Sequence, residues 1–194
     1  MSNHPHLRPG HRNAPGLFAG GSSHNYDRIA RRLLPRVYRR LAIDAAPFAP
    51  NGGAVLDVGT GPAILLRELG RRRPDLRLTG LDLSADMVAA ANRNLAAFGD
   101  RANAVVGDVT DLQFDDDSFD LITTSLSLHH WDRVDAAAPE LARVLRPGGS
   151  VVVYDFPFAP FDELATTGPL TACPRTRVRT GIPFVTCERM VLRS

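Results

Sequence analysis

The stretch VLDVGTGPA, residues 55–63, joins a short apolar run to a helical pattern through a glycine-rich turn. An apolar run of this length, bounded by glycine and proline, is typical of a buried strand, expected here over Ala54–Val58. Gly59 and Gly61 let the backbone turn sharply and approach a ligand with no Cβ in the way. Pro62 fits the first helical position, where its missing N–H costs nothing, so a helix is expected over Pro62–Arg73. The stretch therefore predicts strand, ligand-binding turn and helix in succession.

Strand and helix patterns continue to alternate toward the C-terminus. Strands are expected at residues 76–81, 103–106, 119–125 and 150–154, and helices at residues 85–98, capped by Ser84, and 133–145, ended by Pro147-Gly148-Gly149. Repeated strand–helix units predict an α/β fold with a doubly wound, Rossmann-like sheet that is mostly parallel. From Asp155 onward we expect a helical stretch at residues 161–164 and strands at residues 177–182 and 184–192, the last one an antiparallel closing strand.

Two segments precede the sheet. Residues 1–25 are rich in His, Pro, Gly, Ser and Asn without hydrophobic periodicity, which predicts a flexible N-terminal arm. In the helical segment of residues 26–50, residues 26–46 carry apolar side chains every fourth position, the stripe of an amphipathic helix that Pro35 should kink or split. We expect this helical segment and the arm to form a lid over a binding domain that spans residues 51–194.

Composition excludes several classes of protein. The chain has 194 residues, 44% hydrophobic and 23% charged, which predicts a single compact soluble domain. Cys173 and Cys187 lack the spacing of a metal or redox motif, so no metal and a reducing compartment are expected. No apolar run approaches the roughly 18 residues of a membrane helix, and no signal peptide is evident. We therefore expect a cytoplasmic protein without a membrane span.

The charged residues are unevenly distributed, although the net charge is only +2. All 23 basic residues are Arg, and they outnumber the acids in residues 1–50 and 171–194 but not between. The absence of Lys removes lysine-based Schiff-base and P-loop chemistry. Since no uniformly basic surface is predicted, nucleic acid is not a favoured partner. The oligomeric state is left open, a homodimer included.

Acidic residues lie at the ends of three successive predicted strands. The carboxyl ends of parallel strands form the ligand-binding edge of such a sheet. Asp82 can accept hydrogen bonds from both hydroxyls of a ribose, and Asp108 with Val109 could hold the edge and one face of an adenine. An NAD site is disfavoured because Ile64 stands where its fingerprint needs glycine. Asp57 beside the turn repels a pyrophosphate but favours a cationic ligand, such as a sulfonium with an amino-acid tail.

Taken together, these motifs resemble the class I S-adenosylmethionine-dependent methyltransferases, in the style of quinone-biosynthesis C-methyltransferases and other small-molecule methyltransferases. The resemblance covers about residues 52–156 and includes, in order, VLDVGTGPA, LDLS, GDV, FDLITTSLSLHHW and LRPGGSVVVYDF. Two features depart from the pattern. Ala63 stands where many members have glycine, and the short tail leaves little room for the usual last helix of the substrate pocket.

The resemblance implies S-adenosylmethionine as the cofactor and assigns residues to its parts. The implied cofactor-binding residues are Tyr26, Asp57, Gly59, Thr60, Gly61, Asp82, Leu83, Asp108, Val109 and Ser125. Asp57, Gly59 and Gly61 would line the methionine moiety. Leu83 would pack on the adenine, Ser125 would border the sulfonium through its backbone, and Tyr26 would close over the cofactor.

His129 and His130 follow a strand end near the expected methyl group, and either could act as a base toward the acceptor. A partly buried His bonded to a backbone carbonyl is the commoner arrangement. The run Asp115-Asp116-Asp117 is interpreted as a solvated turn and not as a metal site.

The expected function is methyl transfer to a small-molecule acceptor, at carbon or oxygen, by in-line displacement. Positioning alone can contribute up to roughly 7–11 kcal/mol to such a reaction, which makes a dedicated base optional. An RNA or protein methyltransferase is a second hypothesis, although the Asn/Asp-Pro-Pro-aromatic signature of enzymes that methylate adenine amino groups is missing. A non-catalytic cofactor-binding module, supported by the short tail, is a third.

Overall fold

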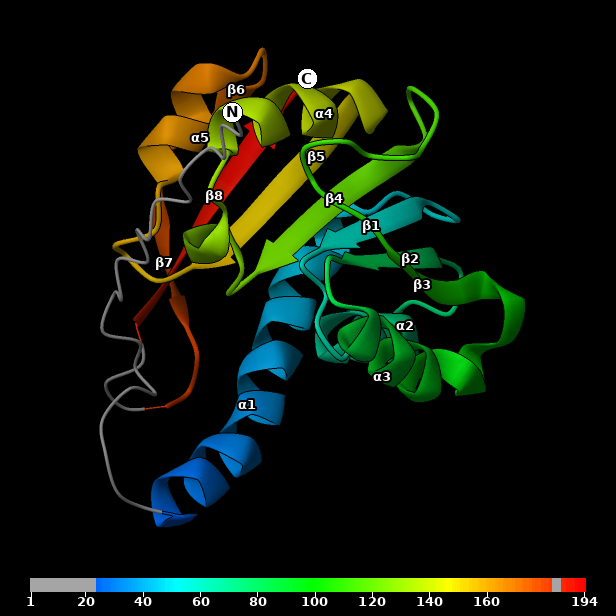
Figure 1. Ribbon diagram of the computed structural model, residues 1–194, viewed down its shortest axis with the longest axis vertical. Coiled ribbons are helices and arrows are strands. Elements are labelled where there is room, and N and C mark those ends of the chain that lie inside the picture. Colours follow the sequence, from blue (N-terminus) through cyan, green and yellow to red (C-terminus); the bar gives the residue numbers. More distant parts are fainter. Residues whose placement is uncertain (1–23, 183–185) are drawn as a thin grey trace, which may run out of the picture.

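A computed structural model describes residues 24–182 and 186–194, with side chains from residue 34 onward. Its centre is one sheet in the order β3-β2-β1-β4-β5-β8-β6, with β7 paired to β8 (Figure 1). The strands are β1 Ala54–Val58, β2 Arg77–Asp82, β3 Ala102–Val106, β4 Phe119–Ser125, β5 Leu145–Asp155, β6 Thr171–Ala172, β7 Thr176–Arg179 and β8 Thr186–Arg193. Strands β1 to β5 are parallel, and β8 is antiparallel to β5. The predicted doubly wound sheet with an antiparallel closing strand is confirmed.

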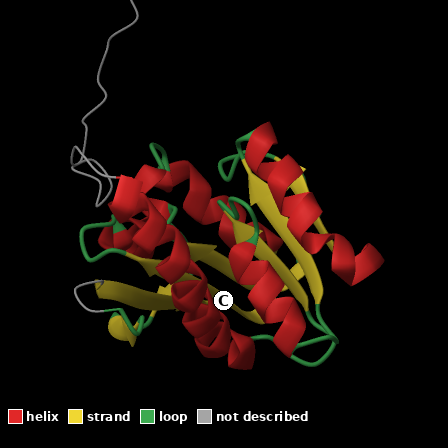
Figure 2. Cartoon of the chain, turned by 90° about the horizontal axis from the view of Figure 1, so that it is seen from below, coloured by secondary structure: helices red, strands yellow, loops and turns green. Residues whose placement is uncertain are grey.

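Helices cover both faces of this sheet (Figure 2). The helices are α1 His24–Ala45, α2 Ile64–Arg72, α3 Ala85–Leu95, α4 Val134–Val144 and α5 Phe161–Thr167. Helices α1, α2 and α3 share one hydrophobic core with the sheet, and α4 and α5 share the other. Short 3-10 turns follow α1 at Ala46–Phe48, α3 at Ala96–Arg101 and β4 at Leu128–His130. Among the helices of the described residues, none is long and apolar enough to cross a bilayer.

The start of α3 shows how the sequence determines a helix locally. Ser84 is its N-cap, and the Ser84 hydroxyl accepts a hydrogen bond from the backbone N–H of Met87. Val88, Ala91 and Leu95 recur at helical spacing and are buried against the sheet. The cap predicted at Ser84 is thus confirmed.

Several predicted elements differ from the structure in their bounds or continuity. Helix α2 begins at Ile64 and not at Pro62, because Ala63 is held in the left-handed conformation at φ 56° and keeps Pro62 in the turn. Helix α4 ends at Val144, and the Pro147-Gly148-Gly149 turn falls within β5, where the pairing with β4 shifts register. Pro35 lies inside α1, which continues through it as one helix of 22 residues, so the predicted split does not occur.

The C-terminal half of α1 is built into the core. Leu41, Ala42 and Ala45 are completely buried between α2 and the sheet. This half of the predicted lid segment therefore belongs to the domain core. Residues 1–23 of the predicted flexible arm lie outside the part of the chain that the structure describes.

Candidate cofactor site

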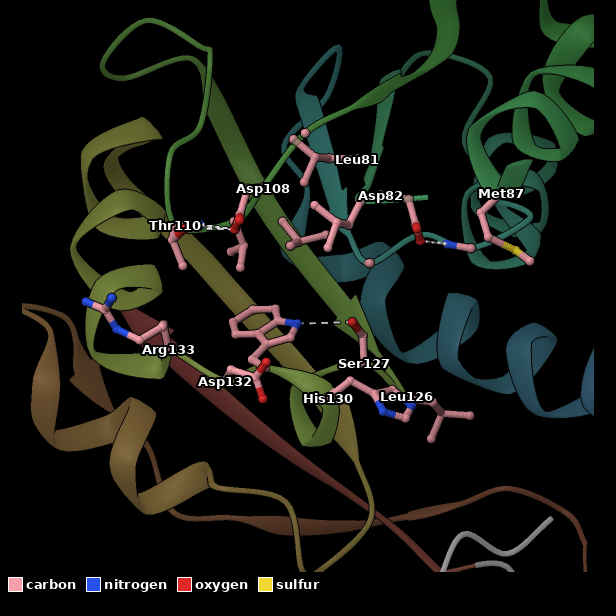
Figure 3. Close-up of a pocket in the computed structure, with 17 residues that line it drawn as sticks. Leu81, Asp82, Met87, Asp108, Thr110, Leu126, Ser127, His130, Asp132 and Arg133 are labelled. Atoms are coloured by element: carbon pink, nitrogen blue, oxygen red, sulfur yellow. Dashed lines mark hydrogen bonds between the residues drawn. The ribbon is translucent and has the colours of Figure 1, made fainter. Parts of the chain in front are cut away.

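A cavity of about 640 Å³ opens at the carboxyl ends of β1, β2, β3 and β4 (Figure 3). This volume lies in the range of small-molecule sites in proteins. Its lining residues are Val58, Gly59, Gly61, Leu81, Asp82, Leu83, Met87, Gly107, Asp108, Val109, Thr110, Leu126, Ser127, His130, Trp131, Asp132 and Arg133. The strand order changes direction between β1 and β4, so the cavity occupies the position where doubly wound sheets bind ligands.

The glycine turn after β1 brings bare backbone against the cavity. Gly59 has a φ of 66°, and a Cβ built on it would lie 1.9 Å from the Oγ of Ser127. That hydroxyl accepts a hydrogen bond of 3.1 Å from the indole N–H of Trp131, so the side chain that opposes Gly59 is fixed in place. Only glycine satisfies both the backbone conformation and the space at this position.

Asp82 lies at the end of β2 with its carboxylate directed across the turn. One oxygen accepts the backbone N–H of Gly61 at 2.8 Å, and the other accepts the backbone N–H of Ser84 at 2.9 Å. Because each carboxylate oxygen has two acceptor positions, each can still accept one hydroxyl proton from a ligand. Leu83, 73% exposed, lies beside this carboxylate on the cavity wall.

Asp108 lies opposite, after β3. Its Oδ1 accepts both the backbone N–H and the hydroxyl of Thr110, at 2.9 and 2.8 Å. These two bonds fix the carboxylate and leave Oδ2 able to accept a donor from a ligand. Val109 adds an apolar contact on the same wall. The side chains of Asp82 and Asp108 thus face one cavity from two neighbouring strands (Figure 3).

Asp57 lies behind the cavity wall and not on it. Its carboxylate is fully buried and accepts hydrogen bonds from the hydroxyls of Thr123 and Thr60, at 2.7 and 2.8 Å. Burial raises the pKa of the Asp57 carboxyl to about 6, and the two hydrogen bonds lower it only in part. Thr60 and Ser125 are likewise buried outside the cavity lining. Asp57 therefore stabilises the turn and places a negative charge beneath it.

Beneath the turn, Tyr38 from α1 approaches this buried layer. Burial, with the charges of Asp57 and Asp155, raises the pKa of the Tyr38 hydroxyl to about 12, while a hydrogen bond with Ser125 lowers it. The phenol therefore stays neutral at physiological pH and can serve as a hydrogen-bond partner of Ser125.

The two histidines take different positions in the turn after β4. His130 lines the cavity, whereas His129 lies behind it with the two ring centroids 3.9 Å apart. The Nδ1 of His129 is 2.7 Å from an oxygen of Asp155, which is completely buried at the end of β5. Partial burial and the neighbouring His129 lower the pKa of His130, and the charge of Asp155 raises it in part. The partner of His129 is therefore a carboxylate and not a backbone carbonyl.

The structure brings together six of the residues predicted at the cofactor: Gly59, Gly61, Asp82, Leu83, Asp108 and Val109. The side chain of Tyr26 lies outside the described residues. Sequence reasoning missed most of the turn after β4, including Leu126, Ser127, Trp131 and Arg133. The rule that parallel strands end at one edge points to this turn, but it does not tell which of its side chains face the cavity.

Comparison with known proteins identifies this arrangement. Residues 55–149 match the family model described as a methyltransferase domain. About half of the chain is therefore similar to a methyltransferase domain. The match spans β1 to the start of β5 and thus includes all four strands around the cavity.

Two curated relatives are methyltransferases of quinone biosynthesis. A ubiquinone/menaquinone biosynthesis C-methyltransferase from Geotalea daltonii is 36% identical over 137 residues, which cover 68% of this chain and 58% of the relative. A demethylmenaquinone methyltransferase from Roseiflexus castenholzii is 41% identical over 116 residues, which cover 60% and 48%. The chain therefore spans about half the length of the curated relatives that it matches.

Solved structures show the same architecture. A protein of Methanococcus maripaludis described as a putative S-adenosylmethionine-dependent methyltransferase gives a TM-score of 0.61 at 29% identity, covering 69% of this chain and 67% of the other. A structure from Aquifex aeolicus gives a TM-score of 0.70 at 16% identity, covering 87% and 94%, and shares the fold.

The residues of the cavity fit S-adenosylmethionine as the cofactor. The carboxylate of Asp82 can accept ribose hydroxyls, and Oδ2 of Asp108 can accept an adenine amino group. The bare backbone at Gly59 leaves space that a side chain would fill. The buried carboxylate of Asp57 suits the positive charges of a sulfonium and an ammonium group.

Proposed function

We propose that this chain transfers a methyl group from S-adenosylmethionine to a small-molecule acceptor, at carbon or oxygen. The observation that carries the proposal is the convergence of Gly59, Asp82 and Asp108 on one cavity from three consecutive strand ends. Bound in this cavity, the cofactor would supply an activated methyl group on a sulfonium. The protein is left to position the acceptor and to exclude water.

Each wall of the cavity has a separate role in this proposal. Asp82 binds the ribose hydroxyls, Leu83 packs on the adenine, and Asp108 with Val109 holds the adenine edge. Gly59 and Gly61 line the methionine moiety. The turn after β4, with His130 and Trp131, borders the methyl group and the acceptor. RNA or protein acceptors and a non-catalytic role stay alternatives, and a cytoplasmic location and a homodimer stay predictions.

Thermal unfolding with S-adenosylhomocysteine, NAD and ATP tests the cofactor assignment. Ligand at about 100 times its dissociation constant stabilises the native state by about 2.7 kcal/mol. For a chain of this size we expect S-adenosylhomocysteine to raise the melting temperature by roughly 5–10 °C. NAD and ATP should have no effect. A shift with NAD alone would overturn the proposal.

The Asp82→Asn variant tests the ribose contact while keeping the shape of the side chain. We expect it to weaken S-adenosylhomocysteine binding at least tenfold, because the amide offers one acceptor oxygen and no charge. Asp86→Asn is the matched control, since Asp86 is an exposed carboxylate in the first turn of the adjacent helix α3. Unchanged affinity in Asp82→Asn, measured by calorimetry, would show that the ribose binds elsewhere.

A further inference from the structure

A histidine–carboxylate pair, His129 and Asp155, lies beside the cofactor cavity. The two residues come from the carboxyl ends of neighbouring strands, because His129 follows β4 and Asp155 ends β5. Asp155 is 0% exposed, and its carboxylate accepts three hydrogen bonds. The donors are Nδ1 of His129 at 2.7 Å, the backbone N–H of His129 at 3.1 Å and the backbone N–H of Phe156 at 2.7 Å. The imidazole is thus held both through its ring and through its own backbone.

This geometry fixes the tautomer of His129. An ionised carboxylate only accepts hydrogen bonds, and the other two contacts of this carboxylate are backbone N–H donors. The ring proton therefore lies on Nδ1, and Nε2 is the basic nitrogen. The ring cannot turn freely, because it packs against Phe156 and Phe158 at centroid distances of 5.4 and 5.8 Å. Its side chain is still 16% exposed, which leaves one edge accessible.

The accessible ring lies one side chain away from the cavity. His130, which lines the cavity, is in ring contact with His129 at 3.9 Å. On the other side, Phe158 is 58% exposed and stacks on Phe156 with ring planes 15° apart. An acceptor that extends from the cavity past His130 toward Phe158 would meet the exposed part of the His129 ring.

We propose that Asp155 is a positioning residue that holds His129 with Nε2 as the base for an acceptor carrying a hydroxyl group. The inference rests on the proposed methyltransferase function and names the acceptor chemistry of that site. For O-methylation, the hydroxyl proton moves to Nε2 and the electron pair left on oxygen forms the bond to the methyl carbon. The pair of the broken carbon–sulfur bond stays on sulfur, which becomes a neutral thioether. The charge on His129 is balanced by Asp155, and the proton then leaves to solvent.

Nitrogen NMR of the histidine rings tests the positioning role without any acceptor. In the wild-type protein bound to S-adenosylhomocysteine, we expect His129 to show a protonated Nδ1 and an unprotonated Nε2. In Asp155→Asn the amide can donate to Nδ1, so the proton should shift to Nε2. A wild-type His129 with its proton on Nε2 would overturn the inference, and so would a tautomer that is unaffected by Asp155→Asn.

Methyl transfer from labelled S-adenosylmethionine to catechol and to 1,4-dihydroxynaphthalene tests the catalytic consequence. Proton transfer by a positioned base contributes about 10²-fold or more. We expect His129→Asn, Asp155→Asn and the double variant each to lower kcat by a similar factor of about 10², because the pair acts as one unit. The KM for the cofactor and the affinity for S-adenosylhomocysteine should be unchanged. The matched control is Asp162→Asn, because Asp162 is an exposed carboxylate at the start of α5.

The two proposals fail in distinguishable ways. Turnover that is undiminished in His129→Asn and Asp155→Asn overturns the role of the pair and leaves the methyltransferase function in place. If the losses in kcat of the two single variants add in the double variant, Asp155 acts independently of His129. This result also overturns the role of the pair. Failure of the wild-type protein to bind S-adenosylhomocysteine overturns the proposed function itself. If neither compound is methylated, the NMR result decides the positioning role.

Discussion

Two independent features of the structure require glycine at position 59. Its φ of 66° lies in the left-handed region, where a residue with a Cβ costs roughly 1–2 kcal/mol. A Cβ would also meet the Oγ of Ser127 at 1.9 Å. We expect Gly59→Ala to lower the free energy of unfolding by more than about 2 kcal/mol and to weaken S-adenosylhomocysteine binding at least tenfold. Urea unfolding and calorimetry measure the two effects.

Gly52 provides a control for the backbone contribution alone. Its φ is 69°, and a Cβ built there meets no atom within 4 Å. Gly52→Ala should therefore cost about 1–2 kcal/mol and leave the affinity for S-adenosylhomocysteine unchanged. Equal loss of affinity in both variants would show that the close approach to Ser127 does not matter.

The buried carboxyl of Asp57 makes the stability of the protein depend on pH. Burial raises its pKa from the ordinary 3.8 to about 6. Because the native state binds the carboxyl proton of Asp57 more tightly than the unfolded chain does, protonation of this carboxyl stabilises the fold. The stabilisation is complete below pH 3.8 and is lost as the pH rises through 6. The difference of about 2 pKa units corresponds to about 3 kcal/mol.

The Asp57→Asn variant isolates this contribution, because an amide does not titrate in this range. We expect the stability of the wild-type protein relative to Asp57→Asn to fall by about 2.4 kcal/mol between pH 4 and pH 7. Urea unfolding of both proteins at several pH values measures it. Parallel profiles for the two proteins would rule out a raised pKa at Asp57.

At the residue scale, the sequence predicts which edge of the sheet forms the cavity better than it predicts which side chains point into that cavity. Asp82 and Asp108 line the cavity as strand-end acids should. Asp57 also ends a strand, but Thr60 and Thr123 draw its carboxylate into the core beneath the turn. That outcome depends on a hydroxyl 66 positions away in the chain, which local patterns do not reveal.

Among the connections between elements, Arg73 fixes the end of α1 relative to α2. Its guanidinium donates to the backbone carbonyls of Ala46, Ala49 and Pro50, each at 3.0 Å, and pairs with Asp75 at 2.8 Å. We expect Arg73→Ala to lower the free energy of unfolding by about 2 kcal/mol, because these carbonyls lose a charged donor. Urea unfolding measures the change.

Arg71, in the last turn of α2, is the matched control. Its side chain is 60% exposed and makes a single ion pair of 3.0 Å with Glu68. Such surface pairs contribute less than about 1 kcal/mol, so Arg71→Ala should change stability little. A loss as large as that of Arg73→Ala would indicate a general charge effect.

Strands were easier to predict than helix ends. The expected bounds of β1 and β4 are confirmed at Ala54–Val58 and Phe119–Ser125, and both strands are buried along almost their whole length. The predicted start of α2 was wrong, because the preference of Pro62 for a first helical position reflects only its immediate neighbours. The turn is determined by the hydrogen bond from Gly61 to Asp82, which comes from another strand.

At the scale of the whole molecule, one sheet separates two hydrophobic cores. Leu66 on α2 is buried in one core, and Leu141 on α4 is buried in the other. Replacing either with Ala should lower the free energy of unfolding by about 2–5 kcal/mol. Because β1 and β4 contribute side chains to both cores, we expect the two layers to unfold together in one transition.

Trp131 makes this expectation measurable, because it is the single tryptophan and packs against the core of α4. Its fluorescence reports on that layer, whereas circular dichroism reports on all helices. In urea, both signals should follow one curve in the wild-type protein, in Leu66→Ala and in Leu141→Ala. If Leu141→Ala shifted the fluorescence transition ahead of the dichroism transition, the α4 layer would be able to unfold alone. The sheet would then fail to couple the layer with Leu141 to the layer with Leu66.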